Sequence, residues 1–244
     1  MICIDNPHQD VCFNLAAEEY LLKNFSEDVF MVWQSEASVV VGKHQNIAVE
    51  VDLDFARSNN IRVVRRQSGG GAVYHDAGNI NLTFIESNTQ PDFNKYILQI
   101  KQMLQSIGVL AQSDERNSIY IDGKKISGSA QFIRRNKSLF HATLLYSTNL
   151  TNLLATLDGK SIASTSSDEK RSKFSVKSVK SPVTNICEFL PESWTLIEFK
   201  NFIINYLMAI GTNNSLYSFT QMDLNAIEQL KLEKYDTTSW NFHA

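Results

Sequence analysis

Three consecutive glycines, Gly69, Gly70 and Gly71, restrict the fold of this chain more than any other feature. A glycine run disfavours regular helix, and it allows backbone angles that a residue with a Cβ atom rarely adopts. The apolar, β-branched runs Ile61–Val64 and Ile80–Ile85 lie on either side of it. We therefore predict a loop with an accessible backbone between two strands.

The same loop suits an anionic ligand. Its glycine N–H groups can approach an anion without obstruction, and Arg66 can add a bidentate contact to a phosphate or carboxylate. It matches neither the phosphate loop that ends in Gly-Lys-Ser/Thr nor the dinucleotide fingerprint, because no helical pattern follows it. The alternative is a structural glycine turn with surface arginines.

A second candidate site follows the Asp122-Gly123 dipeptide, which is typical of a tight hairpin turn. In a strand after this turn, Lys124 and Lys125 face opposite ways, so one of them can point inward. Gly128 would leave space beside the inward lysine, whose ammonium could stabilise charge on a phosphate. The alternative is a hairpin end that lies in solvent.

Two further features each allow two interpretations. His141 alternates into an apolar strand, where a histidine is either a hydrogen-bonded core residue or a catalyst. The segment Asp158–Lys180 is rich in Ser, Lys and Asp, and it is either a solvated surface loop or a cationic clamp over an anion.

Hydrophobic spacing predicts the remaining elements. Helices are expected at Phe13–Asn24, with Glu18 and Glu19 facing water, at Phe93–Ile107 before Gly108, from the capping box at Thr195 to Gly211, and at Thr220–Lys234. Further strands are expected at Val29–Trp33, Ser38–Gly42, Ser118–Asp122, Lys125–Phe132 and Leu139–Tyr146. Since no repeat or linker interrupts this order, we predict one α+β domain over residues 1–244.

Composition excludes several classes of protein. The net charge of −3 gives no overall cationic field for nucleic acid or an anionic membrane. Cys3, Cys12 and Cys187 lack the spacing of a metal site or a disulfide framework, which favours a reducing compartment. No signal peptide and no apolar run of membrane-spanning length is present. We expect a cytoplasmic protein without nucleic-acid or membrane partners.

Residues 65–79, RRQSGGGAVYHDAGN, resemble the signature loop of the lipoate–protein ligase A family. Other segments are similar to family motifs in the same order: Asn14–Glu19, Lys125–Ala130, His141–Leu145, Ser178–Lys180, Val183–Asn185 and Trp240–Phe242. The resemblance covers essentially the whole chain. It implies a mixed β-sheet flanked by helices, as in the catalytic domains of biotin ligases and class II aminoacyl-tRNA synthetases.

The resemblance also implies a reaction in two steps. ATP and lipoate form lipoyl-adenylate with the help of Mg²⁺, and the lipoyl group then passes to a lysine. The implied acceptors are the lipoyl domains of 2-oxoacid dehydrogenase E2 subunits and the glycine-cleavage H protein. No metal held by protein ligands alone is implied.

Residue by residue, the resemblance makes Lys125 the catalytic charge, which bridges the lipoate carboxylate and the α-phosphate. It implies that Val40 and Val73 line a tunnel for the dithiolane ring and that Asp158–Lys180 closes over the adenylate. The other residues implied to bind ATP or lipoyl-adenylate are Arg66, Ser68, Gly69, Gly70, Gly71, Ala72, Val73, Tyr74, His75, Asn79, Gly128, His141 and Lys180.

The chain departs from the family pattern at three places. Ser118 stands where a carboxylate is common, and Ala142 stands where glycine is usual. The sequence ends at Ala244, where many members continue into an accessory domain, so we expect that domain to be absent. Either a separate protein supplies it, or the catalytic domain suffices, or the chain only transfers preformed lipoyl-adenylate. We expect activation from lipoate and ATP to be slower than transfer.

Three other functions compete with this one. A lipoyl or octanoyl transferase would use an activated donor and needs a cysteine that faces the lysine pocket. Biotin ligation uses a related fold but a different glycine loop. A non-catalytic carrier of lipoate or its adenylate would need no turnover at all. The sequence does not identify the acceptor, the preference between lipoate and octanoate, or the oligomeric state.

Overall fold

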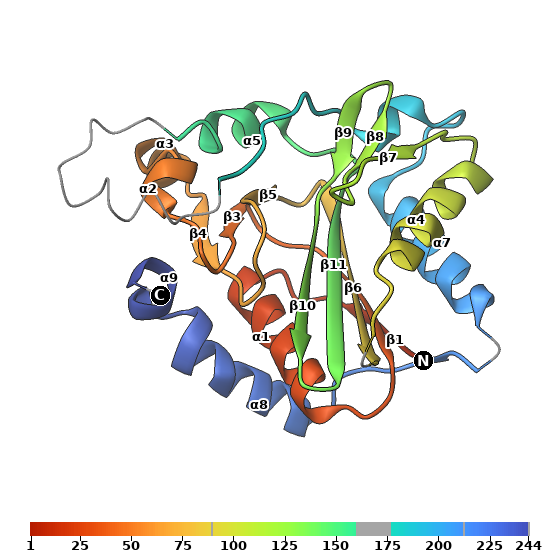
Figure 1. Ribbon diagram of the computed structural model, residues 1–244, viewed down its shortest axis with the longest axis horizontal. Coiled ribbons are helices and arrows are strands. Elements are labelled where there is room, and N and C mark those ends of the chain that lie inside the picture. Colours follow the sequence, from red (N-terminus) through yellow and green to blue (C-terminus); the bar gives the residue numbers. More distant parts are fainter. Residues whose placement is uncertain (89, 160–176, 212, 244) are drawn as a thin grey trace.

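The computed structural model describes residues 1–88, 90–159, 177–211 and 213–243, and its centre is a six-stranded mixed sheet (Figure 1). The strands in spatial order are β10 (Ser129–Arg134), β11 (Lys137–Leu145), β6 (Asn79–Ser87), β2 (Val29–Trp33), β1 (Ile2–Asn6) and β12 (Ser215–Leu216). β1 pairs in parallel with β2 and β12, and the other neighbours pair antiparallel. The predicted α+β architecture with a mixed sheet flanked by helices is confirmed.

One face of this sheet packs against two long helices, α4 (Asn94–Ser106) and α7 (Leu196–Ile210). Side chains at alternate positions of β6 form much of the contact, because successive residues of a strand point to opposite faces. Gly108 follows α4 with a φ of 84°, and a capping box at Thr195 opens α7. Both helix predictions are confirmed to within one or two residues.

The other face is covered by α1 (Val11–Asn24) and α8 (Gln221–Leu230), which continues as a π-helical turn, Lys231–Tyr235. Glu18 and Glu19 of α1 are only 2% and 4% exposed, so the prediction that they face water is wrong. Residues distant in sequence provide their partners, and paired carboxylates can be buried at a tolerable cost. Those partners are Thr83 and His141 for Glu18, and Lys23, Lys234 and Tyr235 for Glu19.

A small second sheet contains the glycine loop. Its strand order is β4 (Arg62–Arg65), β3 (Ser38–Val41) and β5 (Val73–His75). The loop runs from β4 into β5, a strand of three residues that the sequence pattern did not predict. Three short helices pack nearby: α2 (Ile47–Glu50), α3 (Leu53–Ser58) and α5 (Leu150–Thr156).

A third, antiparallel sheet is formed by β7 (Gln112–Ser113), β8 (Ile119–Ile121) and β9 (Lys124–Ser127). Asp122 and Gly123 have φ angles of 48° and 73°, as a type I′ turn requires, so the hairpin is confirmed. The single strand predicted over residues 125–132 is wrong, since it is divided at Gly128 into β9 and β10. The carbonyl of Gly128 instead accepts the N–H of Thr143 at 3.0 Å.

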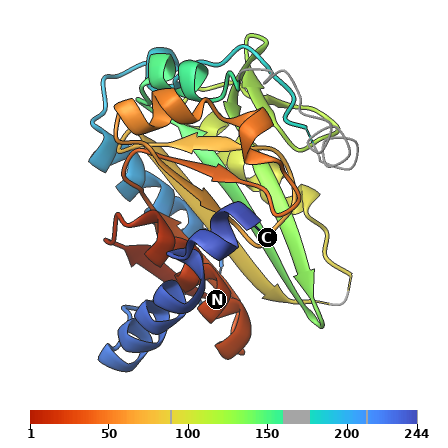
Figure 2. The ribbon, with the colours of Figure 1, turned by 90° about the vertical axis from the view of Figure 1, so that its left-hand side faces the viewer.

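The C-terminal helix α9 (Thr238–His243) lies beside the small sheet (Figure 2), and a 3₁₀ turn, Ile186–Phe189, precedes α7. No helix in the described part of the chain is both long and apolar enough to cross a bilayer. Most of the loop predicted at 158–180 lies outside the described residues, including Lys170, Arg171 and Lys173 of the expected clamp.

Candidate active site

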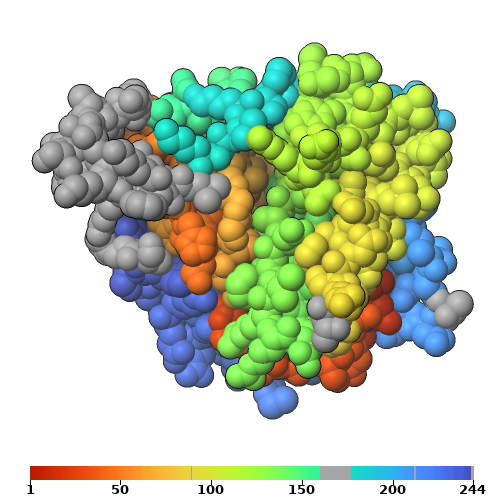
Figure 3. Space-filling model, viewed as in Figure 1, coloured from red at the N-terminus to blue at the C-terminus, as the bar shows by residue number. Residues whose placement is uncertain are grey.

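A cavity with two adjoining lobes, of about 540 and 370 Å³, lies where the three sheets meet. Val73, Lys125, Gly128 and Thr143 line both lobes. In Figure 3 the segments that contribute these walls converge on one face: β5 in orange, residues 177–181 in cyan and β8 to β10 in green. The glycine loop and the hairpin lysine, which the sequence predicted separately, therefore belong to one site.

The floor of the larger lobe is a polar area on an otherwise apolar sheet face. The register of β2, β6 and β11 places Trp33, Asn81 and Thr143 side by side in one row. Met31, Thr83 and His141 form the next row, and the row beyond it is wholly apolar. Strand pairing thus concentrates polar groups at the end of the sheet that meets the glycine loop.

Lys125 lies where the two lobes join. Its neighbour Lys124 is exposed, as the alternation along β9 predicts. Gly128 lies against the end of the Lys125 side chain, since a Cβ atom built on it would lie 3.6 Å from Nζ, an ordinary contact distance. Burial lowers the pKa of Lys125, and the charge of Asp114 opposes this shift. Among the described residues, Lys125 is the one cation that lines both lobes.

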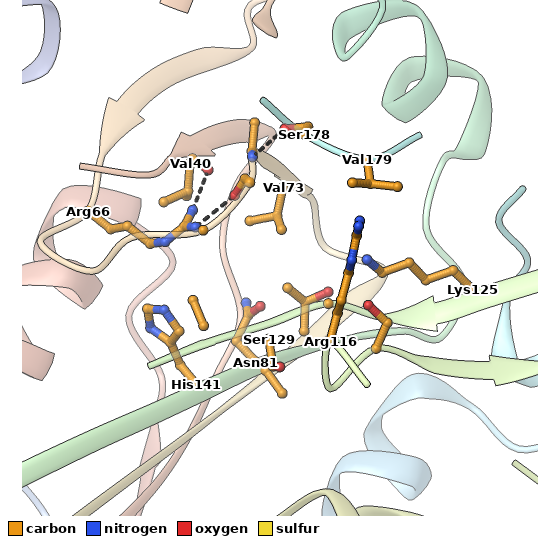
Figure 4. Close-up of a pocket in the computed structure, with 18 of the residues that line it drawn as sticks. Val40, Arg66, Val73, Asn81, Arg116, Lys125, Ser129, His141, Ser178 and Val179 are labelled. Carbon is orange, nitrogen blue, oxygen red and sulfur yellow. Dashed lines mark hydrogen bonds between the residues drawn. The ribbon is translucent and has the colours of Figure 1, made fainter. Parts of the chain in front are cut away.

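Arg66 lines the larger lobe, but the residue is only 4% exposed and its guanidinium binds its own loop. Figure 4 shows its bond to Val40, from Nη1 to the carbonyl oxygen at 2.9 Å. Its Nη2 donates to the carbonyls of Gly69 and Gly71 at 2.6 and 2.7 Å. Burial lowers the pKa of Arg66 to about 10, which leaves it cationic at neutral pH. Arg66 therefore shapes the glycine loop as well as adding positive charge.

A chain of hydrogen bonds ties His141 to the loop and to α1. Its Nε2 lies 2.9 Å from the Ser68 Oγ, which also accepts from Arg66 Nε at 2.9 Å. Its Nδ1 lies 3.1 Å from Glu18 Oε1, and Thr83 Oγ1 donates to that same oxygen at 2.6 Å. His141 is thus a fully hydrogen-bonded residue that also lines the larger lobe.

Two buried polar side chains in the larger lobe have no hydrogen-bond partner among the described residues. They are His75, 3% exposed, and Asn81, 1% exposed, and every side-chain nitrogen and oxygen of the pair is unpaired. Burial lowers the pKa of His75 to about 3, with the charges of Arg66 and His141 adding to the effect, so its ring is neutral. Each unpaired buried group costs about 1–3 kcal/mol. Sequence reasoning missed Asn81, although a polar residue between Ile80 and Leu82 was a usable signal.

The described end of the predicted clamp closes one side of the cavity. Ser178 Oγ accepts the Ala72 N–H at 2.8 Å and the Gln45 amide at 3.0 Å. Its own N–H donates to the Glu50 carboxylate at 3.1 Å. Sequence reasoning gave Ser178 no role. Lys180 lines the smaller lobe and forms an ion pair with Asp158.

The carboxylate of Asp114 lies at the Lys125 end of the larger lobe, in the same wall as Ser118. It accepts the Ser118 N–H at 2.8 Å and the Tyr120 hydroxyl at 3.0 Å. These bonds outweigh the opposing effect of burial and lower its pKa. No group of three or more His, Cys, Asp or Glu among the described residues could hold a metal. One carboxylate plus substrate phosphates is nevertheless a common environment for Mg²⁺.

The other expected site residues fall into two groups. Gly70, Gly71 and Ala72 line the larger lobe, and Tyr74 lines the smaller one. Ser68, Gly69 and Asn79 are in neither wall. Asn79 is buried, donates to the Tyr74 carbonyl at 3.1 Å and accepts the Asp76 N–H at 3.4 Å, so it holds the turn between β5 and β6.

None of the three cysteines lines either lobe. Burial raises the pKa of Cys3 and of Cys12 to about 12, and it also raises the pKa of Cys187. A thioester-forming transferase requires a thiolate nucleophile in its active site. The described walls of the cavity contain none.

An α+β domain whose glycine loop and half-buried lysine line one cavity suits an enzyme that activates a carboxylate. Residues 10–208 match the family model described as the lipoyl protein ligase A/B catalytic domain. The chain belongs to the lipoate–protein ligase family, and it is an enzyme of that class.

Curated relatives and solved structures support this assignment. Lipoate-protein ligase LplJ of Bacillus subtilis is 34% identical over 99% of this chain and 73% of its own length. Lipoate–protein ligase 1 of Staphylococcus aureus is 38% identical over 98% of this chain and 72% of its own. One similar structure is a bipartite lipoate protein ligase from Thermoplasma acidophilum, solved in a study of an archaeal lipoylation system with its E2 lipoyl domain. Its TM-score is 0.78 and its identity is 26%, over 99% of this chain and 95% of that one. A lipoate-protein ligase A bound with ATP has the same TM-score at 24% identity, covering 98% and 97%, and shows the shared fold.

Proposed function

We propose that this chain activates lipoate with ATP in the cavity and transfers the lipoyl group to a lysine of a lipoyl-domain protein. Lys125, placed where the two lobes join, is the observation that carries the proposal. An acyl-adenylate has an apolar acyl chain, a nucleotide and an anionic link between them. A two-lobed cavity with a cation at its junction suits that division.

The larger lobe is the better place for the lipoyl chain. Leu15, Trp33 and Val40 give it apolar surface, and Lys125 and Arg66 also line this lobe. The smaller lobe suits the adenosine part, since Leu145, Leu153 and Leu157 offer apolar surface for a flat base. Gly70 and Gly71 line the larger lobe and Ala72 lines both lobes, so the backbone of this loop can reach the phosphate.

In the first step a lipoate carboxylate oxygen attacks the α-phosphorus of ATP, and the bond from that phosphorus to the bridging oxygen breaks. Pyrophosphate leaves with the electron pair. The Lys125 ammonium, held by β9, stabilises the charge that develops on the α-phosphate and the carboxylate. Asp114 is the residue that would hold a Mg²⁺ at this end, where the ion would neutralise phosphate charge.

In the second step the neutral amine of the acceptor lysine attacks the acyl carbon. The bond from this carbon to the phosphate oxygen breaks, AMP leaves, and the amine proton passes to solvent. Lys125 orients the mixed anhydride and stabilises the leaving phosphate. The segment 177–181, held over the cavity by Ser178, limits the access of water to the anhydride.

We further propose that residues 1–244 act as one catalytic domain in the cytoplasm. An E2 lipoyl domain is the acceptor class that the Thermoplasma ligase supports, and the H protein follows from the family resemblance. A separate accessory protein, which the family resemblance implies, is a further proposed partner, since the Thermoplasma ligase is bipartite.

Mass spectrometry of an apo lipoyl domain tests the proposal. The domain is incubated with this protein, Mg²⁺ and either lipoate with ATP or preformed lipoyl-adenylate. Lipoylation of one lysine from both donors supports a self-sufficient ligase. Lipoylation from the adenylate alone would mean that the protein only transfers a preformed lipoyl group. Modification from neither donor would contradict the proposal.

A further inference from the structure

The larger lobe contains two side chains that have no hydrogen-bond partner among the described residues, His75 and Asn81. The adenylation steps described above use neither of them. Both are more than nine-tenths buried and both line this lobe. The nearby polar groups Ser68, His141 and Glu18 are all paired with one another. His75 and Asn81 therefore stay available for an atom of the ligand.

Their position separates them from the reacting end of the cavity. Figure 4 shows Asn81 between His141 and Lys125. The ring of His75 contacts Trp33 edge to face, with centroids 5.5 Å apart. Asn81 is the middle residue of the row that links Trp33 to Thr143, which lies beside the Lys125 end.

The dimensions match an eight-carbon acyl chain. Trp33 and Thr143 lie two strand spacings apart, which is about 10 Å. An extended chain of eight carbons has a similar length, about 9 Å from bonds of roughly 1.5 Å. A carboxyl group beside Lys125 thus places the second half of the chain past Asn81 and its far end beside Trp33 and His75.

Lipoate and octanoate differ at that far end. The two sulfur atoms of the dithiolane ring are weak hydrogen-bond acceptors, whereas octanoate ends in hydrocarbon. The Asn81 amide has two N–H donors, and the neutral imidazole of His75 has one. Octanoate would leave all of these donors unpaired in a buried site, and unpaired buried donors are costly.

We infer that His75 and Asn81 are specificity-determining residues that recognise the dithiolane sulfurs and make the enzyme prefer lipoate to octanoate. This inference rests on the proposed function. The two residues come from different sheets, β5 and β6, so they approach the ring from two sides of the lobe. Their role is separate from that of Lys125, which contacts the carboxyl end of either acid.

The test compares lipoate and octanoate in the wild type, Asn81→Leu and His75→Phe. Ligation rates give kcat/KM for each acid, and calorimetry gives each binding constant without ATP. We expect each variant to lower the ratio of lipoate to octanoate by about two- to tenfold, the range of one hydrogen bond. Asn81→Leu is also expected to raise the melting temperature, because an apolar side chain removes an unpaired buried amide.

Ser138→Ala is the matched control. The Ser138 hydroxyl is likewise buried and unpaired, but it lies on β11 outside the cavity walls. This variant is expected to keep the wild-type ratio. If Asn81→Leu does not fold, Asn81→Ala and His75→Phe provide the same comparison.

An unchanged ratio in the Asn81 and His75 variants, with turnover retained or lost equally for both acids, would overturn the inference. A wild type that binds both acids equally would overturn it as well. Failure of the wild type to ligate either acid would instead contradict the proposed function, and the calorimetric ratio would still decide this inference.

Discussion

The indole nitrogen of Trp240 donates a hydrogen bond to the carbonyl oxygen of Arg65 at 2.8 Å. The neighbouring Asn241 accepts the Arg65 N–H at 2.8 Å, so the C-terminal helix holds the last residue of β4 on both sides. Arg66 and the glycine loop begin at the next position. A motif at the end of the chain therefore fixes the start of the active-site loop.

Asn241→Ala is expected to destabilise the protein by about 1–3 kcal/mol, because the Arg65 N–H loses its side-chain partner and the Tyr235 carbonyl keeps only the Cys12 thiol. Asn241 is 6% exposed, and it also donates to the Tyr235 carbonyl at 2.8 Å. Urea denaturation measures the change, and the KM for ATP should rise as the loop loosens. Trp240→Phe removes one bond and should cost less. Equal stability of Asn241→Ala and the wild type would contradict this role.

Gly42→Ala tests how closely β3 approaches the glycine loop. A Cβ atom at Gly42 would lie 2.2 Å from the Gly70 carbonyl oxygen, so the loop backbone must move. We expect a loss of stability of about 1–3 kcal/mol, as for other overpacked sites. Gly69→Ala is the control, since its Cβ would meet nothing within 4 Å. Thermal denaturation measures the two variants. If their melting temperatures change by the same amount, the close approach to Gly70 does not explain the glycine at position 42.

The buried carboxylate of Glu19 should control stability in acid. Burial would raise its pKa, but hydrogen bonds from Lys23, Lys234 and Tyr235 prevail and lower the pKa from 4.5 to about 2. A lowered pKa means that the stabilisation is complete above pH 4.5 and is lost as the pH falls toward 2. The shift corresponds to about 3 kcal/mol.

Glu19→Gln removes that titration. Its free energy of unfolding should be lower than that of the wild type at pH 7 and should depend less on pH between 4.5 and 2. The exposed Glu233→Gln is the control and should follow the wild-type profile. Parallel pH profiles for Glu19→Gln and the wild type would show that ionisation of Glu19 does not control stability in acid.

The two half-reactions should differ in rate. Ser118 supplies no carboxylate beside Lys125, and Asp114 is the acidic residue at that end of the larger lobe. We therefore expect transfer from lipoyl-adenylate to exceed the complete reaction from lipoate and ATP. Ser118→Asp should accelerate pyrophosphate release and leave transfer unchanged. Equal wild-type rates with both donors, at matched enzyme concentration, would refute the expectation.

Hydrophobic spacing and turn residues predicted the helices and turns that depend on neighbouring residues in the sequence. The spacing of Phe93–Ile107 and the φ-permissive Gly108 define α4, and Asp122-Gly123 defines the hairpin. Strands β5 and β12, of three and two residues, are too short for a periodic signal. The break at Gly128 depends on pairing with Thr143, which the local sequence does not show.

The site was only partly predictable for the same reason. Alternation along β9 places Lys125 inward and Lys124 outward. The burial of Glu18 could not be foreseen, because its partners Thr83 and His141 are far away in sequence. Ser178 closes the cavity through similarly distant contacts.

The proposed mechanism depends on the Lys125 ammonium, which activates the acyl group, and a comparison of Lys125→Met with Lys124→Met isolates its contribution. Lipoylation of an apo lipoyl domain from lipoate and ATP is followed by mass spectrometry, with melting temperatures as a check on folding. Loss of an electrostatic group of this kind costs roughly 100-fold or more in rate. We expect that loss for Lys125→Met in a folded protein and near-normal turnover for Lys124→Met. Turnover of Lys125→Met within a few-fold of the wild type would contradict it.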